Sequence, residues 1–482
     1  MTIARVVVSL AFLACIARET WASDQWPMFQ QNASHNGFMP VPLDPSRFHS
    51  LWDADLGGAS LNPVTGADGL VFVTQRGYFG VQSLFTLNAR NGSVRWSVDY
   101  EGVFSVNPPS YGFGNVYIQT CNNAGDTYLR SYRARDGRFR FRTLHGAQWE
   151  RYSAPTIFDG AVYVDGGEYG GMYSFDAVSG SEGWYVGLPQ YDGWTPAVDA
   201  GHTYAYLGEY APGLYVFDRI SGTPAYTIVD PNFRWDGWTM GPAPVLDGQG
   251  GAFTIHDGRL TKWDLKGQAI AWQLFSTFSG EPAVHGGVVY AIDAGTFAAY
   301  DRKTGERQWA VEIPNDNLGG NIVVTQTHAF VSGAKAVYCI DLDAKSSIWS
   351  WPSPGALAIA EGTLYIAGVD GVVHAIGLGV QDISVPVSFA EGRSRLGIPV
   401  TRSLTIRNFG DHPLQITSVT SSSTLFEVPT KGFTIAAHGQ KAVPVTFTPA
   451  AVGKTGATLT VASDDPNESS VTTHLTGKGI AP

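Results

Sequence analysis

Aromatic and acidic side chains gather in three short segments of this chain and in two triplets between them. The segments are QWERYSAP (148–155), QYDGWTPA (190–197) and RWDGWTMGPAP (234–244), and each triplet is Gly-Glu-Tyr. Flat aromatic rings can stack on the apolar face of a sugar while carboxylates accept hydrogen bonds from its hydroxyl groups. A ring of acids could also hold Ca²⁺. The candidate ligand face consists of Trp149, Tyr152, Glu168, Tyr169, Tyr191, Asp192, Trp194, Glu209, Tyr210, Asp236 and Trp238.

A purely structural explanation competes with this one. Asp-Gly-Trp is also turn chemistry followed by a packed ring, and it would recur simply because the surrounding segments are duplicated. The chain has no Gly-x-Ser-x-Gly elbow, no His-Glu-x-x-His pair and no phosphate-binding loop. We therefore predict no catalytic residue and no metal ligand, and treat the candidate face as a binding surface.

The elements that would position this face are repeats. Seven segments, among them SFDAVSGSEGW (174–184) and AYDRKTGERQW (299–309), carry a turn motif followed by an aromatic residue, and successive aromatics are 37 to 46 residues apart. A period of this length indicates one supersecondary unit used again and again. With an eighth aromatic near the N-terminus, the predicted docking residues are Trp52, Trp96, Phe141, Trp184, Tyr226, Trp272, Trp309 and Trp349.

Each repeat contains four short apolar or alternating runs separated by turn residues, as in residues 153–187. Four antiparallel strands in ~40 residues are typical of a β-propeller blade. Five of the turns open with an aspartate that can cap them: Asp176, Asp218, Asp264, Asp301 and Asp341. The candidate ligand residues fall where the first strand of a blade begins or where its second and third strands meet. In a propeller these positions share one face.

The two ends of the repeat region complete one another. Residues 356–378 supply only three strands after the last docking aromatic, while residues 49–57, around Trp52, supply an isolated one. Pairing them would close the ring and remove exposed strand edges. We predict an all-β fold with an eight-bladed propeller closed by its N- and C-terminal strands.

These turn-plus-tryptophan segments, and the entry segment DQWPMFQQNASHNG (24–37), resemble the pyrroloquinoline-quinone-like propellers. That family includes quinone-dependent dehydrogenases and non-enzymatic scaffolds such as the outer-membrane assembly lipoproteins. The dehydrogenases place their cofactor beside a disulfide between adjacent cysteines, and this chain has no Cys-Cys pair and no Cys-x-x-Cys-His haem site. The resemblance therefore implies a scaffold without cofactor, with a quinone- or metal-dependent oxidoreductase that uses the quinone and Ca²⁺ as the alternative.

The chain divides into three predicted parts. Residues 1–22 have one early basic residue, an apolar core and a small-residue end, as in a secretory signal; Cys15 as a lipid acceptor is the alternative. Residues 23–379 form the propeller. Residues 380–482 contain no tryptophan and alternate with period two, which predicts a β-sandwich. Their segments LTIRNFGDHPLQI, VTFTPAAVG and LTGKG resemble the immunoglobulin-like domains of the ASPM/SPD-2/Hydin type.

The charge of the chain limits the classes of partner that we expect, and the positions of its cysteines predict their redox state. The net charge is −11, and because the signal segment and the C-terminal part each carry +1, the propeller carries −13. This disfavours nucleic acid and anionic membranes as partners. Cys121 and Cys339 lie on distant blades, so we expect two buried free thiols. No segment besides the signal approaches the length of a membrane span.

Together these features predict an exported protein, periplasmic, extracellular or at the cell surface, with a protein or glycan partner. A non-catalytic scaffold is the favoured function, a carbohydrate-binding surface protein a further alternative, and a monomer the expected state.

Overall fold

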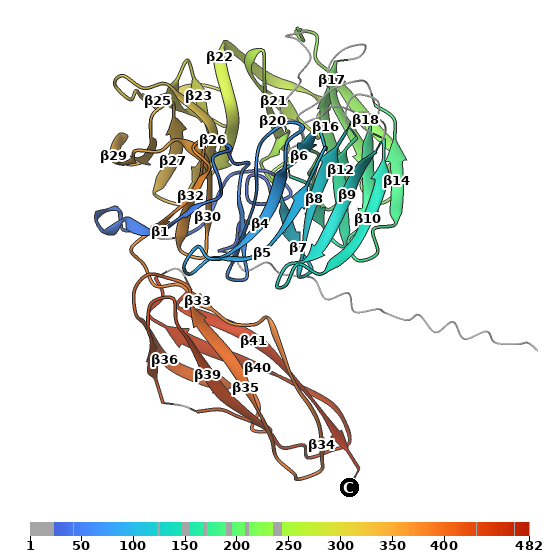
Figure 1. Cartoon of the computed structure of the whole chain (residues 1–482), viewed down its shortest axis with the longest axis vertical. Helices are drawn as coiled ribbons and strands as arrows, with labels where there is room; N and C mark the ends of the chain where they lie inside the picture. The colour runs from blue at the N-terminus through green and yellow to red at the C-terminus, as the bar shows by residue number, and fades with distance from the viewer. Residues whose placement is uncertain are drawn as a thin grey trace, which may run out of the picture.

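The computed structural model describes residues 24–41, 43–122, 126–146, 154–166, 171–188, 195–207, 212–234, 243–429, 431–466 and 468–481 (Figure 1). Apart from one short 3₁₀ helix, η1 (Pro45–Arg47), all regular elements of this part are strands. The predicted all-β class is therefore confirmed. A search of the described part for a helix long and apolar enough to cross a membrane finds none.

The strands β1 to β32 pair antiparallel in groups of four, or of five in the second group, and these groups form the ring in the upper part of Figure 1. The first three groups are β2 (Thr65–Ala67), β3 (Leu70–Thr74), β4 (Gln82–Asn88) and β5 (Val94–Tyr100); β6 (Ser105–Val106) and β7 (Ser110–Gly112) with β8 (Asn115–Cys121), β9 (Thr127–Arg133) and β10 (Phe139–His145); and β11 (Thr156–Phe158), β12 (Ala161–Asp165), β13 (Met172–Asp176) and β14 (Glu182–Val186).

The next groups follow the same order. They are β15 (Ala197–Val198), β16 (His202–Leu207), β17 (Gly213–Asp218) and β18 (Pro224–Val229); β19 (Val245–Leu246), β20 (Gly251–His256), β21 (Gly258–Asp264) and β22 (Ala269–His285); β22 again with β23 (Val288–Asp293), β24 (Thr296–Asp301) and β25 (Arg307–Val311); and β26 (Leu318–Val324), β27 (His328–Gly333), β28 (Val337–Asp341) and β29 (Ser346–Trp351).

Strand β22 serves two groups. Its first part pairs with β21 and its end, from Phe278, pairs with β23, so the outer strand of one blade runs directly into the inner strand of the next. A single parallel bridge between Glu281 and Asn321 then ties it to β26. We count the groups as eight blades, with β22 shared by two of them.

The last group contains both ends of the repeat region. Strands β30 (Gly355–Ala360), β31 (Thr363–Gly368) and β32 (Val372–Gly377) are completed by β1 (His49–Asp55), whose residues pair from His49 opposite Gly377 to Asp55 opposite Val372. The predicted closure of the ring by N- and C-terminal strands is confirmed. No loop connects β1 to β32, so side-chain packing and the six paired residues of β1 must hold the ring shut.

The five predicted aspartate caps are confirmed. In every case one carboxylate oxygen accepts the N–H groups of the second and third residues after it, as Asp218 Oδ1 does from Ile220 and Ser221 at 3.1 and 2.8 Å. In the seven repeats the residue four before the docking aromatic has a positive φ, including Gln268 and Lys345 where glycine is missing. Phe48, four before Trp52, is the exception with a φ of −61°. The turn geometry thus survives the loss of the glycine.

The aromatic residues contact the turn of the next blade. The Trp184 ring lies so close to Gly222 that a Cβ there would stand 2.6 Å from its Cδ2 atom, and its Nε1 donates to the Arg219 carbonyl oxygen at 3.0 Å. Trp52, Trp96 and Trp272 make the same pair of contacts with the following turns, and Phe141 packs on Gly180. Tyr226, which faces a turn without the glycine, uses its hydroxyl group to reach the Leu265 carbonyl oxygen instead.

An N-terminal segment, residues 24–39, crosses the channel and contacts the inner strand of blade after blade. Its main chain bonds with Gly66, Tyr111, Val198, Leu246, Val284 and Val324, and the Asp24 carbonyl oxygen accepts the N–H of Glu361. His35 is fully buried in it and bonds through Nδ1 to the Pro244 carbonyl oxygen and through Nε2 to Thr156 Oγ1. We call residues 24–39 the plug.

The C-terminal part is a two-sheet sandwich, as predicted. One sheet holds β33 (Ile383–Ser384), β35 (Val400–Asn408), β39 (Gln440–Phe447) and β37 (Phe426–Glu427), and the other holds β34 (Ser388–Arg395), β41 (Ser470–Ile480), β40 (Gly453–Ser463), β36 (Leu414–Ser421) and β38 (Phe433–Ile435). Their inner faces share an apolar core that includes Leu404, Val419 and Leu459.

The sandwich joins the propeller at the face opposite the entries of the inner strands. Phe409 lies against Gly69 in the turn between β2 and β3, and Phe409 N–H donates to the Asp382 carbonyl oxygen. Asp24, Glu361 and Asp382 are buried at this junction. Two of their oxygens, Asp24 Oδ1 and Asp382 Oδ2, have no hydrogen-bond partner among the described residues. The junction therefore buries several acids close together.

Candidate ligand-binding site at the channel mouth

All eleven residues of the predicted ligand face lie outside the described residues. They belong to the stretches 147–153, 167–170, 189–194, 208–211 and 235–242. Their role therefore stays a prediction. The inner-strand entries of other blades are described, and they line a cavity.

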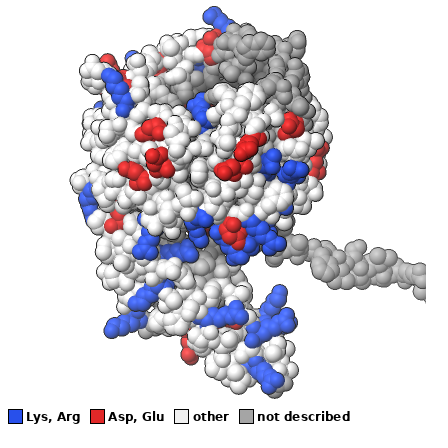
Figure 2. All heavy atoms as spheres, viewed as in Figure 1, with Lys and Arg blue, Asp and Glu red and all other residues white. Residues whose placement is uncertain are grey.

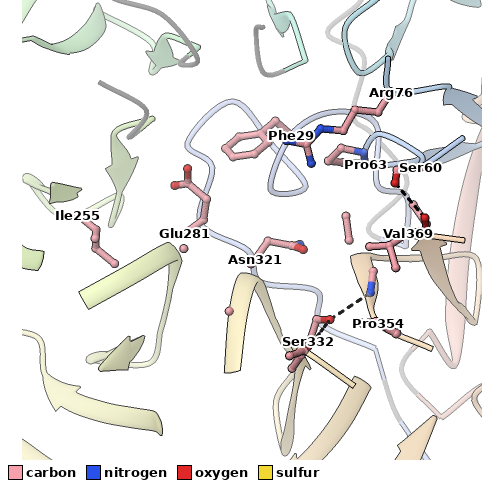
Figure 3. A pocket seen from close by; sticks show the side chains of 18 of the residues that line it. Phe29, Ser60, Pro63, Arg76, Ile255, Glu281, Asn321, Ser332, Pro354 and Val369 are labelled. Atoms are coloured by element: carbon pink, nitrogen blue, oxygen red, sulfur yellow. Dashed lines mark hydrogen bonds between the residues drawn. The ribbon is translucent and has the colours of Figure 1, made fainter. Parts of the chain in front are cut away.

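The cavity opens at the mouth of the central channel and has a volume of about 810 Å³. Inner-strand entries line it at Ser60–Pro63, Gly280–Glu281, Gly319–Asn321 and Pro354–Ala356, and turns between second and third strands add Arg76, Asp257, Ala334 and Val369. Figure 3 shows Glu281 on one side of the cavity and Phe29 and Arg76 on another. The structure thus brings together the two kinds of loop that the sequence placed on one face.

The plug contributes to this cavity. Phe29 is half-buried, lines the cavity and meets His35 edge-on at 5.3 Å between ring centroids. Next to it, the buried Gln30 side chain donates to the carbonyl oxygens of Pro282 and Ile322 at 3.4 Å. The cavity is consequently a blind recess, with the chain's own N-terminal segment across the channel behind it.

Glu281 is the acid of this recess that has a carboxylate oxygen shielded from solvent. It sits where β22 bridges to β26, and its Oε2 atom is shielded from solvent without a hydrogen-bond partner among the described residues. Burial raises the pKa of Glu281 to about 8, although a backbone N–H from Ala243 opposes the shift. At neutral pH the group is therefore mostly a protonated carboxyl group, which can donate a hydrogen bond as well as accept one.

Asn321, directly beside Glu281 in the ladder, is already engaged. Its Nδ2 donates to the Leu357 carbonyl oxygen at 2.8 Å and to Gln30 Oε1 at 3.2 Å, and its Oδ1 accepts the Leu357 N–H at 3.0 Å. The amide holds two blades and the plug together. It is a positioning residue for the recess rather than a free ligand group.

Some of the other polar side chains of the recess are hydrogen-bonded within the protein, and others are not. Ser60 Oγ donates to the Val369 carbonyl oxygen at 2.9 Å, and Ser332 Oγ accepts the Gly355 N–H at 3.1 Å. Arg76 is exposed, and no side-chain hydrogen bond or ion pair of it is recorded among the described residues. Glu281, Arg76 and the exposed Asp257 are thus the charged or ionisable groups available to a ligand.

This set of residues does not fit a quinone held with a cation. The described part contains no group of three His, Cys, Asp or Glu side chains arranged to hold a metal ion, and Glu281, whose Oε2 atom is shielded from solvent, is mostly protonated near neutral pH. Cys121 on β8 and Cys339 on β28 are both buried and form no disulfide with each other. No described serine of the recess has a base to activate it.

Sequence reasoning overlooked the groups that the recess presents. Glu281 lies in SGEP (279–282), a segment without an aromatic ring, and Phe29 lies in DQWPMFQQNASHNG, which entered only through a family resemblance. The only signal for Glu281 is an acid at an inner-strand entry, and its contact with Asn321 of the next blade joins residues far apart in the sequence.

Comparison with known families and structures agrees with the architecture. The model of the family described as outer membrane protein assembly factor BamB matches residues 43–274, 125–351 and 293–381 in overlapping copies. A second model, of the HYDIN/CFA65/VesB-like immunoglobulin-like domain, matches residues 392–478. A search of the curated proteins gives no match to this chain.

Two solved structures share the fold at low sequence identity. BamB from Moraxella catarrhalis is 19% identical with a TM-score of 0.53, and the match covers 68% of this chain and 99% of that one. A europium-containing methanol dehydrogenase is 12% identical with a TM-score of 0.56, and the match covers 74% of this chain and 98% of that one. Because the family model spans most of the propeller, the chain belongs to the BamB family of outer membrane protein assembly factors and carries a HYDIN-type immunoglobulin-like domain after its propeller.

Proposed function

We propose that this protein is an exported, non-catalytic scaffold whose channel mouth receives a segment of a protein partner. The observation that supports it most strongly is the recess behind Glu281, a large cavity with few free polar side chains. A family described as assembly factors agrees with a scaffolding function. The proposed partner-binding face includes the recess together with the eleven residues predicted from the sequence.

The glycine-rich wall of the recess favours a polypeptide as the occupant. Gly258, Gly280, Gly319, Gly320, Gly333 and Gly355 all line it. Because these residues have no side chains, the main chain of an extended peptide can come close to this wall. A protonated Glu281 can bond to such a peptide without a buried negative charge.

Two experiments distinguish the proposed scaffold from an oxidoreductase and from a carbohydrate-binding protein. The purified chain is incubated with pyrroloquinoline quinone, Ca²⁺ and a redox dye, and oxidation of alcohols or sugars should be absent. Dye reduction above the level without quinone would contradict a non-catalytic function. On a glycan array, hits that weaken in Trp194→Ala or Trp238→Ala would support the carbohydrate-binding alternative instead.

The recess itself can be closed without strain, which gives the test of partner binding. A Cβ at Gly319 would meet no atom within 4 Å, and its φ lies outside the left-handed region. Gly319→Trp should therefore fill the mouth and abolish cross-linking of a partner from a probe placed there. Gly201→Trp, in a turn on the opposite face whose Cβ would make only an ordinary 3.7 Å contact, is the matched control.

A further inference from the structure

A basic surface stands out on this acidic propeller. Six arginines fall within thirteen residues of the second blade: Arg130, Arg133, Arg135, Arg138, Arg140 and Arg142. Among the described residues, the only ion pairs recorded for this run join Arg133 and Arg135 to Asp136. In Figure 2, basic side chains gather along the propeller on the side where Figure 1 draws β9 and β10.

Two of these arginines lie directly opposite each other. Arg130 on β9 is the register partner of Arg142 on β10, so their side chains leave the same face of the sheet. Like charges in directly opposite positions destabilise a strand pair. Neither guanidinium group has a carboxylate within ion-pair distance in the described part of the chain.

Tyrosine rings hold both guanidinium groups in place. Arg130 and Arg142 lie 5.0 and 5.2 Å from the centroid of the same ring, that of Tyr128, and Arg130 also lies 5.2 Å from the Tyr100 centroid of the first blade. Arg130 Nε donates to Thr120 Oγ1 at 2.8 Å. A guanidinium group stacked on a ring keeps donors free at its edge, where carboxylates bind.

Apolar side chains border the two arginines. Leu144, two residues after Arg142, is 53% exposed, and Phe139 is 51% exposed at the start of the same strand. Arginine and tyrosine beside exposed apolar groups form the composition that dominates protein–protein binding energy. An extended anionic surface such as a membrane would be repelled by the rest of the propeller, whose net charge is −13. A short acidic segment contacts only this basic patch.

We propose that Arg130 and Arg142, with Tyr100 and Tyr128, form a docking site for an acidic peptide segment of a protein partner. Carboxylates of that segment neutralise the paired guanidinium groups, and its apolar side chains cover Leu144 and Phe139. The site lies on the outer strands of the second blade, apart from the channel mouth, so neither proposal depends on the other.

The test uses the full chain and a fluorescein-labelled peptide of alternating glutamate and leucine, followed by fluorescence anisotropy. The matched peptide replaces every glutamate by glutamine. We expect binding of the acidic peptide alone, and a loss of affinity of about tenfold or more in Arg130→Gln/Arg142→Gln, since the double variant removes both charged hydrogen-bond donors. Arg142→Lys, which keeps the charge but not the planar fork, should lose part of the affinity.

A second pair of arginines supplies the control for charge alone. Arg393 and Arg395 are exposed on β34 of the sandwich, so Arg393→Gln/Arg395→Gln removes the same charge elsewhere. Equal weakening by both double variants, or an unaffected affinity in Arg130→Gln/Arg142→Gln, would overturn the proposal. Binding of phosphatidylglycerol vesicles without binding of the peptide would assign the surface to a membrane and overturn it as well.

Folding of the variants can be monitored separately. Because the two arginines repel each other, the double variant should unfold at a temperature no lower than the wild type by circular dichroism. If it does unfold earlier, the exposed Arg142→Gln alone carries the binding test, with Arg393→Gln as its control.

Discussion

Gly222 and Gly114 have the same backbone conformation and differ in what surrounds them. Both have a φ of +69°, but a Cβ at Gly222 would stand 2.6 Å from the Trp184 ring, whereas one at Gly114 would meet nothing within 4 Å. Alanine at either position suffers the strain of the left-handed conformation. Only at Gly222 must the aromatic residue of the preceding blade also move.

We therefore predict that Gly222→Ala lowers the free energy of unfolding by about 1–3 kcal/mol more than Gly114→Ala does, since overpacking a fitted contact costs this much. Urea unfolding followed by tryptophan fluorescence measures both variants. Equal destabilisation would mean that the contact between Trp184 and the turn adds nothing to the stability of the ring.

Residue types explain which parts of the site were predictable. The aspartate caps follow from local chemistry, because the carboxylate and the N–H groups that it binds are two and three residues apart. Glu281 and Arg130 owe their surroundings to residues distant in sequence, the bridged Asn321 of the next blade in one case and Tyr100 in the other. A single sequence shows such acids and arginines as ordinary surface residues.

At the scale of elements, the plug is the feature that the repeat pattern did not disclose. The segment is not a repeat and has no strand periodicity, yet it bonds to inner strands all around the channel. Closure by β1 was predictable, since the last blade lacked a strand and the N-terminus had one to spare. The position of residues 24–39 depends on the ring that surrounds them.

His35 tests the importance of the plug. It is fully buried and bonded to the Pro244 carbonyl oxygen and Thr156 Oγ1, so His35→Leu should cost about 1–3 kcal/mol of unfolding free energy at pH 7 by leaving these partners without it. His202→Leu, at a partly exposed histidine of the fourth blade, should cost less than about 0.5 kcal/mol. Similar urea midpoints for the two variants would contradict a stabilising role of the plug.

The pH dependence of the same variant provides an independent measurement. Burial lowers the pKa of His35 to about 4, so the folded protein does not take up the proton that the unfolded chain binds below its ordinary pKa near 6.5. The wild type should lose stability from this group as pH falls from about 6.5 to 4. The difference between wild type and His35→Leu should accordingly shrink over this interval, and a constant difference would show that His35 is not buried as a neutral ring.

At the scale of the whole molecule, the junction between propeller and sandwich is acidic. Burial, and next the negative charge of Glu468, raise the pKa of Asp24 to about 7, and burial with neighbouring acids raises those of Glu361 and Asp382 well above their ordinary values. The folded protein therefore holds protons that the unfolded chain releases. Stability from this junction is fully present below pH 4 and falls as pH rises from about 4 to 7.

Asp24→Asn should flatten this dependence. We expect the thermal midpoint of the wild type to drop between pH 5 and pH 8 more than that of Asp24→Asn, with the variant the more stable of the two at pH 8. Asp343→Asn, at an exposed acid of the seventh blade, is the control and should follow the wild type. Parallel curves for all three proteins would indicate that Asp24 is not part of a proton-holding cluster.

Binding of a partner segment in the recess at the channel mouth is tested most directly by photo-cross-linking. Val369 lines the recess and is 58% exposed, so a benzophenone amino acid can replace it in the exported chain within the producing cells. We predict one discrete protein adduct on illumination, retained with Gly201→Trp and lost with Gly319→Trp. No adduct, or an adduct that persists when Gly319→Trp fills the mouth, would contradict a partner-binding recess.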